Sequence, residues 1–166
     1  MTDLKTLYEE DTAAWAENQA TALRAIARGG SNQELDWENL AEEIEDLARF
    51  QRRSLRSHIR NIIEHLIKLE HSAADRPRRK WRLSVINSRM KAEDRLAESP
   101  SLKPQLQQII GEEIPRGAKL AIAALEERRE LSESLREELT AKSYLEFFTY
   151  IPDQILGDWF PEEPKP

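Results

Sequence analysis

Two of the chain's three histidines lie seven residues apart in the segment HIRNIIEH, at His58 and His65. Imidazole rings bind metals and transfer protons, so this spacing raises the question of a shared site. On a helix, a rise of 1.5 Å per residue separates their Cα atoms by about 10.5 Å. Helical metal-binding pairs use spacings of three or four residues instead. We therefore expect no shared ion, and the sequence predicts no metal site.

The three histidines are expected to differ in their surroundings. Projection at 100° per residue places His58 in the apolar sector of its helix and His65 at the polar edge of that sector. His58 is therefore interpreted as a hydrogen-bonded core histidine. His65 is the better functional candidate, because its position allows contact with solvent or substrate. His71 is interpreted as a solvated residue at a helix end.

Two charged residues also fall on apolar stripes, Arg89 in one predicted helix and Asp11 in another. A guanidinium keeps its charge when it is buried, so Arg89 must find partners. We favour a structural ion pair with Asp11, Glu93 or a tail carboxylate over an anion-binding cleft. For Asp11, an ion pair with Arg52 or Arg53 across a helical hairpin is favoured over a ligand role.

The candidate polar cluster consists of Asp11, His65 and Arg89. If these side chains converged, they could form the cleft of a ligand-binding protein or enzyme, with a metal or an anionic ligand. Against an enzyme, the sequence has no Gly-rich phosphate loop, nucleophile elbow or HExxH motif, and it lacks cysteine. No catalytic residue and no cofactor are predicted.

A basic patch surrounds Trp81 and is the most nucleic-acid-like feature of the sequence. Residues 49–95 hold 14 Lys and Arg against 5 Asp and Glu, whereas the rest of the chain holds 11 against 26. This segregation could bind phosphate, but we favour attraction between the two parts within the fold. Trp81 belongs to an apolar stripe, which favours a core anchor over a base-stacking ring. The cations of the patch are Arg76, Arg78, Arg79, Lys80 and Arg82.

The composition predicts a single all-α domain. Of the 166 residues, 34 % are charged, only 5 are Gly and 8 are Pro, and these values are typical of helical proteins. Apolar periodicity predicts helices over about 3–28 and 36–73, then one that follows Pro77 and reaches about residue 97. A fourth should carry Leu106 to Leu125, with a kink or a split at Pro115. These four main helices form the predicted bundle, with the long second helix at its centre.

Local signals set the expected ends of these helices. Gly29-Gly30 should end the first, Asp36 should cap the second next to Leu35, and Pro77 should break the chain before the third. A short helix is expected over about 132–141. The aromatic tail that follows is expected to pack on the bundle. The predicted domain therefore covers residues 1–161, and only 162–166 should be loose.

The sequence predicts a cytoplasmic protein. It has no apolar run of the roughly 20 residues needed to span a bilayer, and its N-terminal residues lack the features of a signal peptide. The leading hypothesis is a non-enzymatic interaction or accessory protein whose partner is another protein. The alternatives are the enzyme or ligand-binding cleft and nucleic-acid binding through residues 49–95.

Five stretches carry a family resemblance: YEEDTAAWAENQATALR, LDWENLAEEIEDLARFQRRSLRSHIRNIIEHLIKL, RKWRLSVINSR, ESPSL and YIPDQILGDWFP. Together and in this order, they resemble the pattern of the bacterial domain-of-unknown-function 29 family. The resemblance covers nearly the whole chain and implies a small all-helical fold without an established activity. The tail departs from the pattern, because relatives have a Pro-rich turn similar to ECPY where this chain has EFFTYIP.

The resemblance assigns no catalytic role to any residue. Within it, His65 rather than His58 is the characteristic histidine. The matching positions are Tyr8, Asp11, Trp15, Leu35, Asp36, Glu38, Leu40, Glu42, Glu43, Ile44, Glu45, His65, Leu66, Trp81, Arg89 and Pro100 through Leu102.

Overall fold

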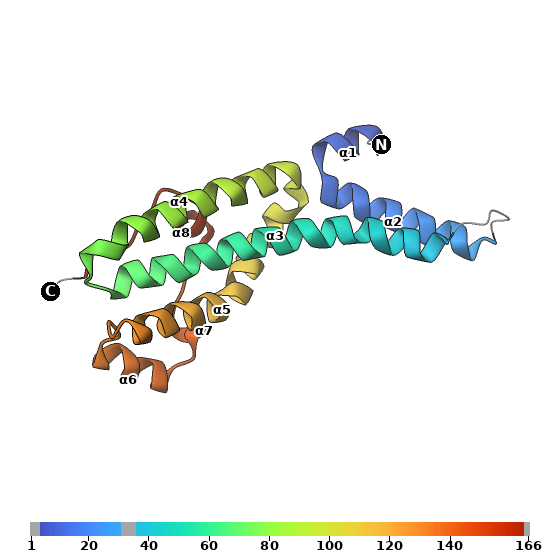
Figure 1. Cartoon of the computed structure of the whole chain (residues 1–166). Helices are drawn as coiled ribbons and strands as arrows, with labels where there is room; N and C mark the ends of the chain where they lie inside the picture. The colour runs from blue at the N-terminus through green and yellow to red at the C-terminus, as the bar shows by residue number, and fades with distance from the viewer. Residues whose placement is uncertain (1–3, 31–35, 165–166) are drawn as a thin grey trace. The chain divides into compact units, whose positions relative to one another are not determined.

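The computed structural model describes residues 4–30 and 36–164, and every regular element within these ranges is a helix (Figure 1). The predicted all-α class is thus confirmed. The chain forms two compact units, the first made of Met1–Leu55 and Asp94–Pro104 and the second of Arg56–Glu93 and Gln105–Pro166. Two helices continue from one unit into the other, α3 (Trp37–His71) and α4 (Asp75–Glu98). The single domain over 1–161 stays a prediction.

The first unit contains α1 (Leu4–Glu10), α2 (Thr12–Arg28) and the start of α3. Helix α2 and the start of α3 form an antiparallel hairpin, as predicted. Its core is built from small side chains, because Ala13, Ala16 and Ala48 are buried together. Trp15 and Ile44 pack against this alanine core.

The single helix predicted over 3–28 is wrong, because the chain is interrupted at Asp11. The backbone of Asp11 is extended, with φ −152° and ψ 92°, and its side chain accepts a hydrogen bond from the backbone N–H of Ala14. A carboxylate that accepts this bond stabilises the start of a new helix. Residue 3 lies outside the described residues.

Three predicted signals at the hairpin turn can be compared with the structure. Helix α2 ends at Arg28, and Gly30 adopts a left-handed φ of 75°, as expected for a Gly-Gly terminus. Asp36 Oδ1 accepts a hydrogen bond of 3.2 Å from the backbone N–H of Asn39, which confirms the predicted cap of α3. Leu35 lies outside the described residues.

The second unit packs the rest of α3 against most of α4 and against α5 (Leu106–Glu127). Helices α3 and α5 approach each other closely at Gly117, where an added Cβ would lie 2.8 Å from Cγ2 of Ile63. A larger residue would force the two helices apart at this point. The core uses large aliphatic side chains. Those that are at most 1 % exposed include Ile59, Ile62, Ile63, Leu66, Ile67, Leu69, Ile110, Leu125 and Ile155.

Two prolines behave differently from the prediction. The break before α4 falls at residues 72–74, and Pro77 lies within the first turn of α4. Proline is tolerated there because the first backbone N–H groups of a helix have no partner within the helix. At Pro115, helix α5 continues without a break, so of the two predicted alternatives the split does not occur and the kink stays a prediction.

The aromatic tail packs on the second unit, as predicted. The short helix α6 (Glu133–Ala141) begins after a Ser132 cap and is followed by α7 (Tyr144–Phe147) and α8 (Pro152–Leu156). Helix α7 contacts α5 and α6, and α8 contacts α5. Tyr150 and Ile155 are only 5 % and 0 % exposed. The 310 helix η1 (Pro100–Gln105) precedes α5.

Across the described part of the chain, each helix is too short or too polar to cross a bilayer.

Candidate functional site

Asp11 links two helix starts within the first unit. Its Oδ1 accepts hydrogen bonds from the backbone N–H of Ala14 at 2.8 Å and from Oγ of Ser101 at 3.0 Å. Its Oδ2 accepts a third bond, from the backbone N–H of Ser101 at the start of η1. The side chain is nearly buried, at 8 % exposure. Asp11 therefore caps two helices instead of pairing with Arg52 or Arg53, and Arg52 lies 3.5 Å from Glu17 instead.

Arg89 holds the C-terminal tail through backbone carbonyl groups. Its Nε donates to the carbonyl of Ile155 at 2.8 Å, and Nη2 donates to those of Gln154 at 2.8 Å and Trp159 at 2.6 Å. Cations stabilise the last carbonyls of a helix, here those of α8. Burial lowers the pKa of Arg89, but a guanidinium remains charged. The partners of Arg89 are thus backbone carbonyls rather than the carboxylate of the predicted ion pair.

His65 is half-buried and bonded along its own helix. Its Nδ1 lies 2.8 Å from the carbonyl oxygen of Asn61, so Nδ1 carries a proton and donates it. Its Nε2 lies 3.5 Å from Nζ of Lys68. Burial lowers the pKa of His65, although the Asn61 hydrogen bond opposes the shift. Both ring nitrogens of a neutral imidazole are thereby occupied.

The three residues of the candidate polar cluster have different hydrogen-bond partners within the described ranges. Asp11 binds α2 and η1 of the first unit, whereas Arg89 binds the tail of the second. His65, also in the second unit, binds residues of α3. Convergence of the three on one cleft stays a prediction.

The basic patch around Trp81 separates into buried and exposed residues. Arg78 is only 7 % exposed, and its Nη1 donates to the carbonyl of Ser72 at 2.7 Å. Arg82 stacks on Phe160, with Cζ 4.2 Å from the ring centroid. Trp81 is 8 % exposed and lies in the core, as favoured. The exposed cations are Arg76, Arg79, Lys80 and Arg82.

Sequence reasoning missed the buried carboxylate of Glu113, which is fully enclosed in the second unit. Its oxygens lie 2.7 Å from Nε of Arg56 and 2.7 Å from Nε of Arg60, and Arg116 lies 2.8 Å away. Burial alone would raise the pKa of Glu113, but the hydrogen bonds from the arginines outweigh it and lower the pKa. The signal was available, because Glu113 interrupts the apolar stripe of α5.

These contacts explain the uneven charge of the sequence. Arg56 and Arg60 come from the basic segment 49–95, and Glu113 comes from the acidic remainder of the chain. Such pairs match the favoured interpretation, in which basic and acidic parts attract each other within the fold.

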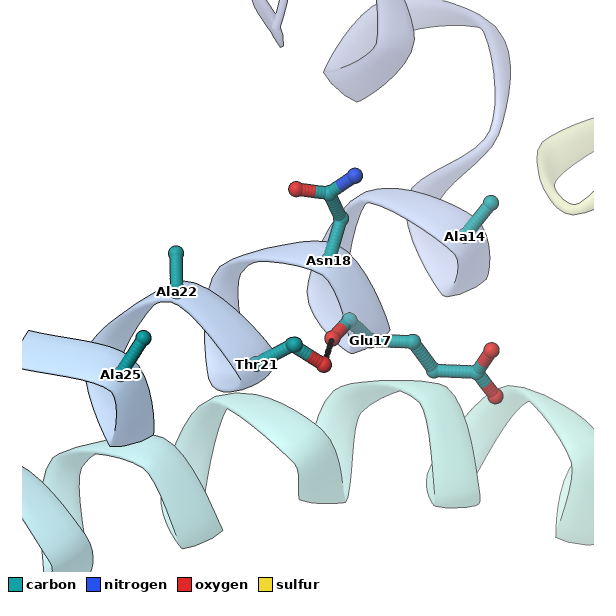
Figure 2. Close-up of a pocket in the computed structure, with 6 residues that line it drawn as sticks. All are labelled: Ala14, Glu17, Asn18, Thr21, Ala22 and Ala25. Atoms are coloured by element: carbon teal, nitrogen blue, oxygen red, sulfur yellow. Dashed lines mark hydrogen bonds between the residues drawn. The ribbon is translucent and has the colours of Figure 1, made fainter. Parts of the chain in front are cut away.

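One hollow follows the outer face of α2 in the first unit. It has a volume of about 480 Å³ and is lined only by residues 14–25. Figure 2 shows Ala14, Asn18 and Ala22 projecting away from α3, and Thr21 donating a 2.9 Å hydrogen bond to the carbonyl of Glu17. Because one helix provides every lining residue, this hollow does not enclose a ligand.

Three large apolar residues of α3 are exposed in the first unit, and we call them the α3 stripe: Leu40, Leu47 and Phe50. Their exposed fractions are 41 %, 45 % and 59 %. The spacings of seven and three residues place them along one side of the helix. The stripe is therefore a row of three exposed apolar residues, interrupted by the exposed Glu43.

A smaller cavity of about 210 Å³, here called the tail pocket, lies in the second unit between the end of α3 and the tail. The prediction of a solvated His71 is wrong, because its ring is 21 % exposed and packs 5.8 Å from that of Phe148. Burial lowers the pKa of His71, opposed by Glu70. The residues that define the pocket are Glu70, His71, Phe147, Phe148, Tyr150 and Trp159.

No metal-binding group of three or more His, Asp or Glu side chains occurs within residues 4–30 and 36–164. Asp11, His65, Arg89 and Glu113 are instead bonded to protein atoms.

Comparison with known proteins supports the helical fold and assigns no function. A crystal structure of an alpha-helical protein of unknown function from Rhodospirillum rubrum is similar, with a TM-score of 0.72 and 27 % sequence identity. The similarity covers 91 % of this chain and 89 % of that one. No protein with a curated description matches the sequence. The family described as "Domain of unknown function DUF29" matches residues 7–159, and the chain therefore belongs to this family.

Proposed function

We propose that this protein is a non-enzymatic interaction protein, and that the α3 stripe binds the α3 stripe of a second copy. The observation that carries the proposal is the exposure of Leu40, Leu47 and Phe50 along one side of a helix. Burying a large apolar side chain is favourable by about 1.5–3 kcal/mol. An exposed row of three such residues therefore favours association.

Charge complementarity supports a second copy as the partner. Along α3, the acidic residue Glu42 precedes Leu47, and the cation Arg53 follows it on the same flank of the stripe. In an antiparallel pair centred near Leu47, the acidic flank of one copy faces the basic flank of the other. A twofold interface of this kind is self-complementary. Arg53 has no ion-pair partner within the described ranges, so it is available for this contact.

The contacts of Asp11, His65 and Arg89 favour binding over catalysis. Each of the three is already hydrogen-bonded to groups that hold the fold together. A catalytic group must instead reach a substrate within hydrogen-bond distance. The polar cluster therefore gives less support to an enzyme than the α3 stripe gives to an interface.

The experiment measures the molar mass of the purified chain over a range of concentrations by light scattering or sedimentation. We expect a monomer–dimer equilibrium, with a dimer Kd that Leu47→Glu raises by roughly a hundredfold because the change occurs in both copies. The matched control is Leu120→Glu, since Leu120 is a similarly exposed leucine of α5, at 48 %. This control should leave the dimer unchanged.

A charge-swap series tests the orientation. Glu42→Arg and Arg53→Glu should each weaken the dimer several-fold, and the double variant should restore it. A chain that stays monomeric at every concentration would contradict the interface. So would a dimer that withstands Leu47→Glu.

A further inference from the structure

We propose that the tail pocket binds a small alkylammonium cation. The pocket belongs wholly to the second unit, and the inference is independent of the interface proposed for α3. Four aromatic rings contribute to its lining, together with the imidazole of His71 and the carboxylate of Glu70. Aromatic rings combined with a negative charge are the usual means by which proteins recognise organic ammonium groups.

The carboxylate in the pocket has no cationic partner. Glu70 Oε2 accepts a hydrogen bond of 3.3 Å from the hydroxyl of Tyr150. Its other neighbour is His71, whose Nε2 lies 4.0 Å away and which burial keeps mostly neutral at pH 7 by lowering its pKa. Within the described ranges, no Lys or Arg forms an ion pair with Glu70. Glu70 therefore offers the pocket a carboxylate without a Lys or Arg partner in the described ranges, and this side chain is 44 % exposed to solvent.

The rings of the pocket also lack a cation, in contrast to other aromatic residues of the same unit. Trp81 has Lys68 and Arg128 over its ring, each with 5.5 Å to the centroid. Phe160 likewise has Arg82 and Arg89 at 4.2 and 4.8 Å. No such contact is found for the tail-pocket rings within residues 4–30 and 36–164. A bound cation would give these rings the cation–π contact that Lys and Arg side chains make with Trp81 and Phe160.

The volume of the pocket and the imidazole of His71 indicate the size and chemistry of the ligand. A volume of about 210 Å³ is below the roughly 300–1,000 Å³ of pockets for drug-sized ligands. It fits a small ammonium group better than a whole metabolite. Nε2 of His71 is buried and has no hydrogen-bond partner in the described part of the chain. A ligand that carries an N–H group can donate to this nitrogen when it is unprotonated.

Hydrogen bonds and burial hold two of the residues that line the tail pocket, Trp159 and Tyr150. Arg89 donates to the carbonyl of Trp159, and this bond fixes the backbone that presents the indole ring. Tyr150 is 5 % exposed, and burial together with Glu70 raises the pKa of its hydroxyl, so the phenol stays neutral. A preformed site loses little entropy when it binds a small ligand.

The test is a titration of the full-length, ¹⁵N-labelled protein with tetramethylammonium chloride, followed by NMR. We expect saturable shifts of the Trp159 indole and of the backbone amides of residues 70 and 147–150, with Kd in roughly the millimolar range. Sodium chloride at equal ionic strength and the neutral isostere tert-butanol are the reference titrations. Both should leave these signals largely unchanged.

Two variants test which side chains of the pocket contribute to the affinity for the cation. Glu70→Gln removes the charge and should weaken binding roughly tenfold. Its control is Glu127→Gln, which makes the same change at an exposed residue of α5 and should have no effect. Trp159→Leu should weaken binding by about 3- to 30-fold, as expected for the loss of a cation–π contact. Thermal unfolding of each variant verifies that the fold is kept.

Three results would overturn the inference: no shift at the pocket signals, equal binding of tert-butanol, or unchanged affinity of a folded Glu70→Gln variant. A second titration identifies the source of the cation, with a short peptide that carries a trimethyllysine side chain. Tighter binding of the peptide than of tetramethylammonium supports a protein partner that presents the cation. Weaker binding supports a free alkylammonium compound.

Discussion

The two compact units are stabilised by different kinds of core. In the hairpin of the first unit, the buried apolar positions up to residue 50 are all alanines, and the large buried residues of this unit, Leu55, Leu96 and Leu102, lie outside that range. In the second unit, Ile63 and its large aliphatic neighbours are fully buried. Because hydrophobic stabilisation scales with the apolar area buried, the second unit gains more from its own packing. Both units also expose large apolar side chains, among them Leu47 and Phe50 in the first and Ile86 and Met90 in the second.

The largest effect should come from emptying the core of the second unit. Ile63→Ala should lower the free energy of unfolding by about 3 kcal/mol, because it removes buried methyl groups and leaves a cavity. The matched change in the first unit, Ile44→Ala, should cost only about 1 kcal/mol, since Ile44 is half-buried. Urea unfolding of both variants measures the difference. Equal losses would show that the two cores contribute alike.

Glycine substitutions in α5 test how closely the helices of the second unit pack. Gly117→Ala should destabilise the protein by about 1–3 kcal/mol, because the new Cβ would lie 2.8 Å from Ile63 and 3.1 Å from the carbonyl oxygen of Arg60. Gly111→Ala should stabilise it by about 0.5–1 kcal/mol, since a Cβ there meets nothing within 4 Å. Thermal unfolding should thus shift in opposite directions for the two variants.

In the first unit, capping by Asp11 should compensate in part for the small core. Asp11→Ala should cost about 1–2 kcal/mol, because it leaves the N–H groups of Ala14 and Ser101 without their acceptor. Hydrogen exchange at these two amides should accelerate. Asp36→Ala is the control, since exposed Asp36 caps α3 alone and should cost less. Slow exchange at both amides in Asp11→Ala would contradict the double cap.

The smallest effect concerns pH and should be confined to the second unit, which contains all three histidines. Burial lowers the pKa of His65 and His71 in the folded state. As pH falls below the ordinary histidine value of about 6.5, the unfolded chain binds protons more readily, so stability decreases. His71→Gln should flatten the decline between pH 7.5 and 5.5, by at most about 1.4 kcal/mol per pH unit. A steeper decline in this variant would reverse the expected sign.

The sequence predicted what depends on local patterns. The periodicity of α3, the Asp36 cap and the short helix expected over about 132–141 involve residues a few positions apart, and the structure agrees with each. Asp11 and Arg89 were singled out because each is a charged residue on an apolar stripe. Both are buried and hydrogen-bonded in the structure.

The partners of these residues could not be predicted, because distant segments supply them. Asp11 binds Ser101, 90 residues away, and Arg89 binds carbonyls 65 to 70 residues away. Side-chain patterns contain no information about backbone acceptors. The surroundings of His71 were mispredicted for a related reason, since its burial depends on Phe148 of the tail.

The contacts of Arg89 have a consequence for how the tail can change over evolutionary time. The guanidinium binds main-chain oxygens, which every amino acid possesses, so it does not distinguish among side chains at positions 154, 155 and 159. The tail can therefore acquire new side chains while it keeps its anchor. Arg89 itself has no such freedom, because a lysine lacks the planar fork that reaches three carbonyls at once. Substitution of Arg89 would remove three hydrogen bonds to the tail at once.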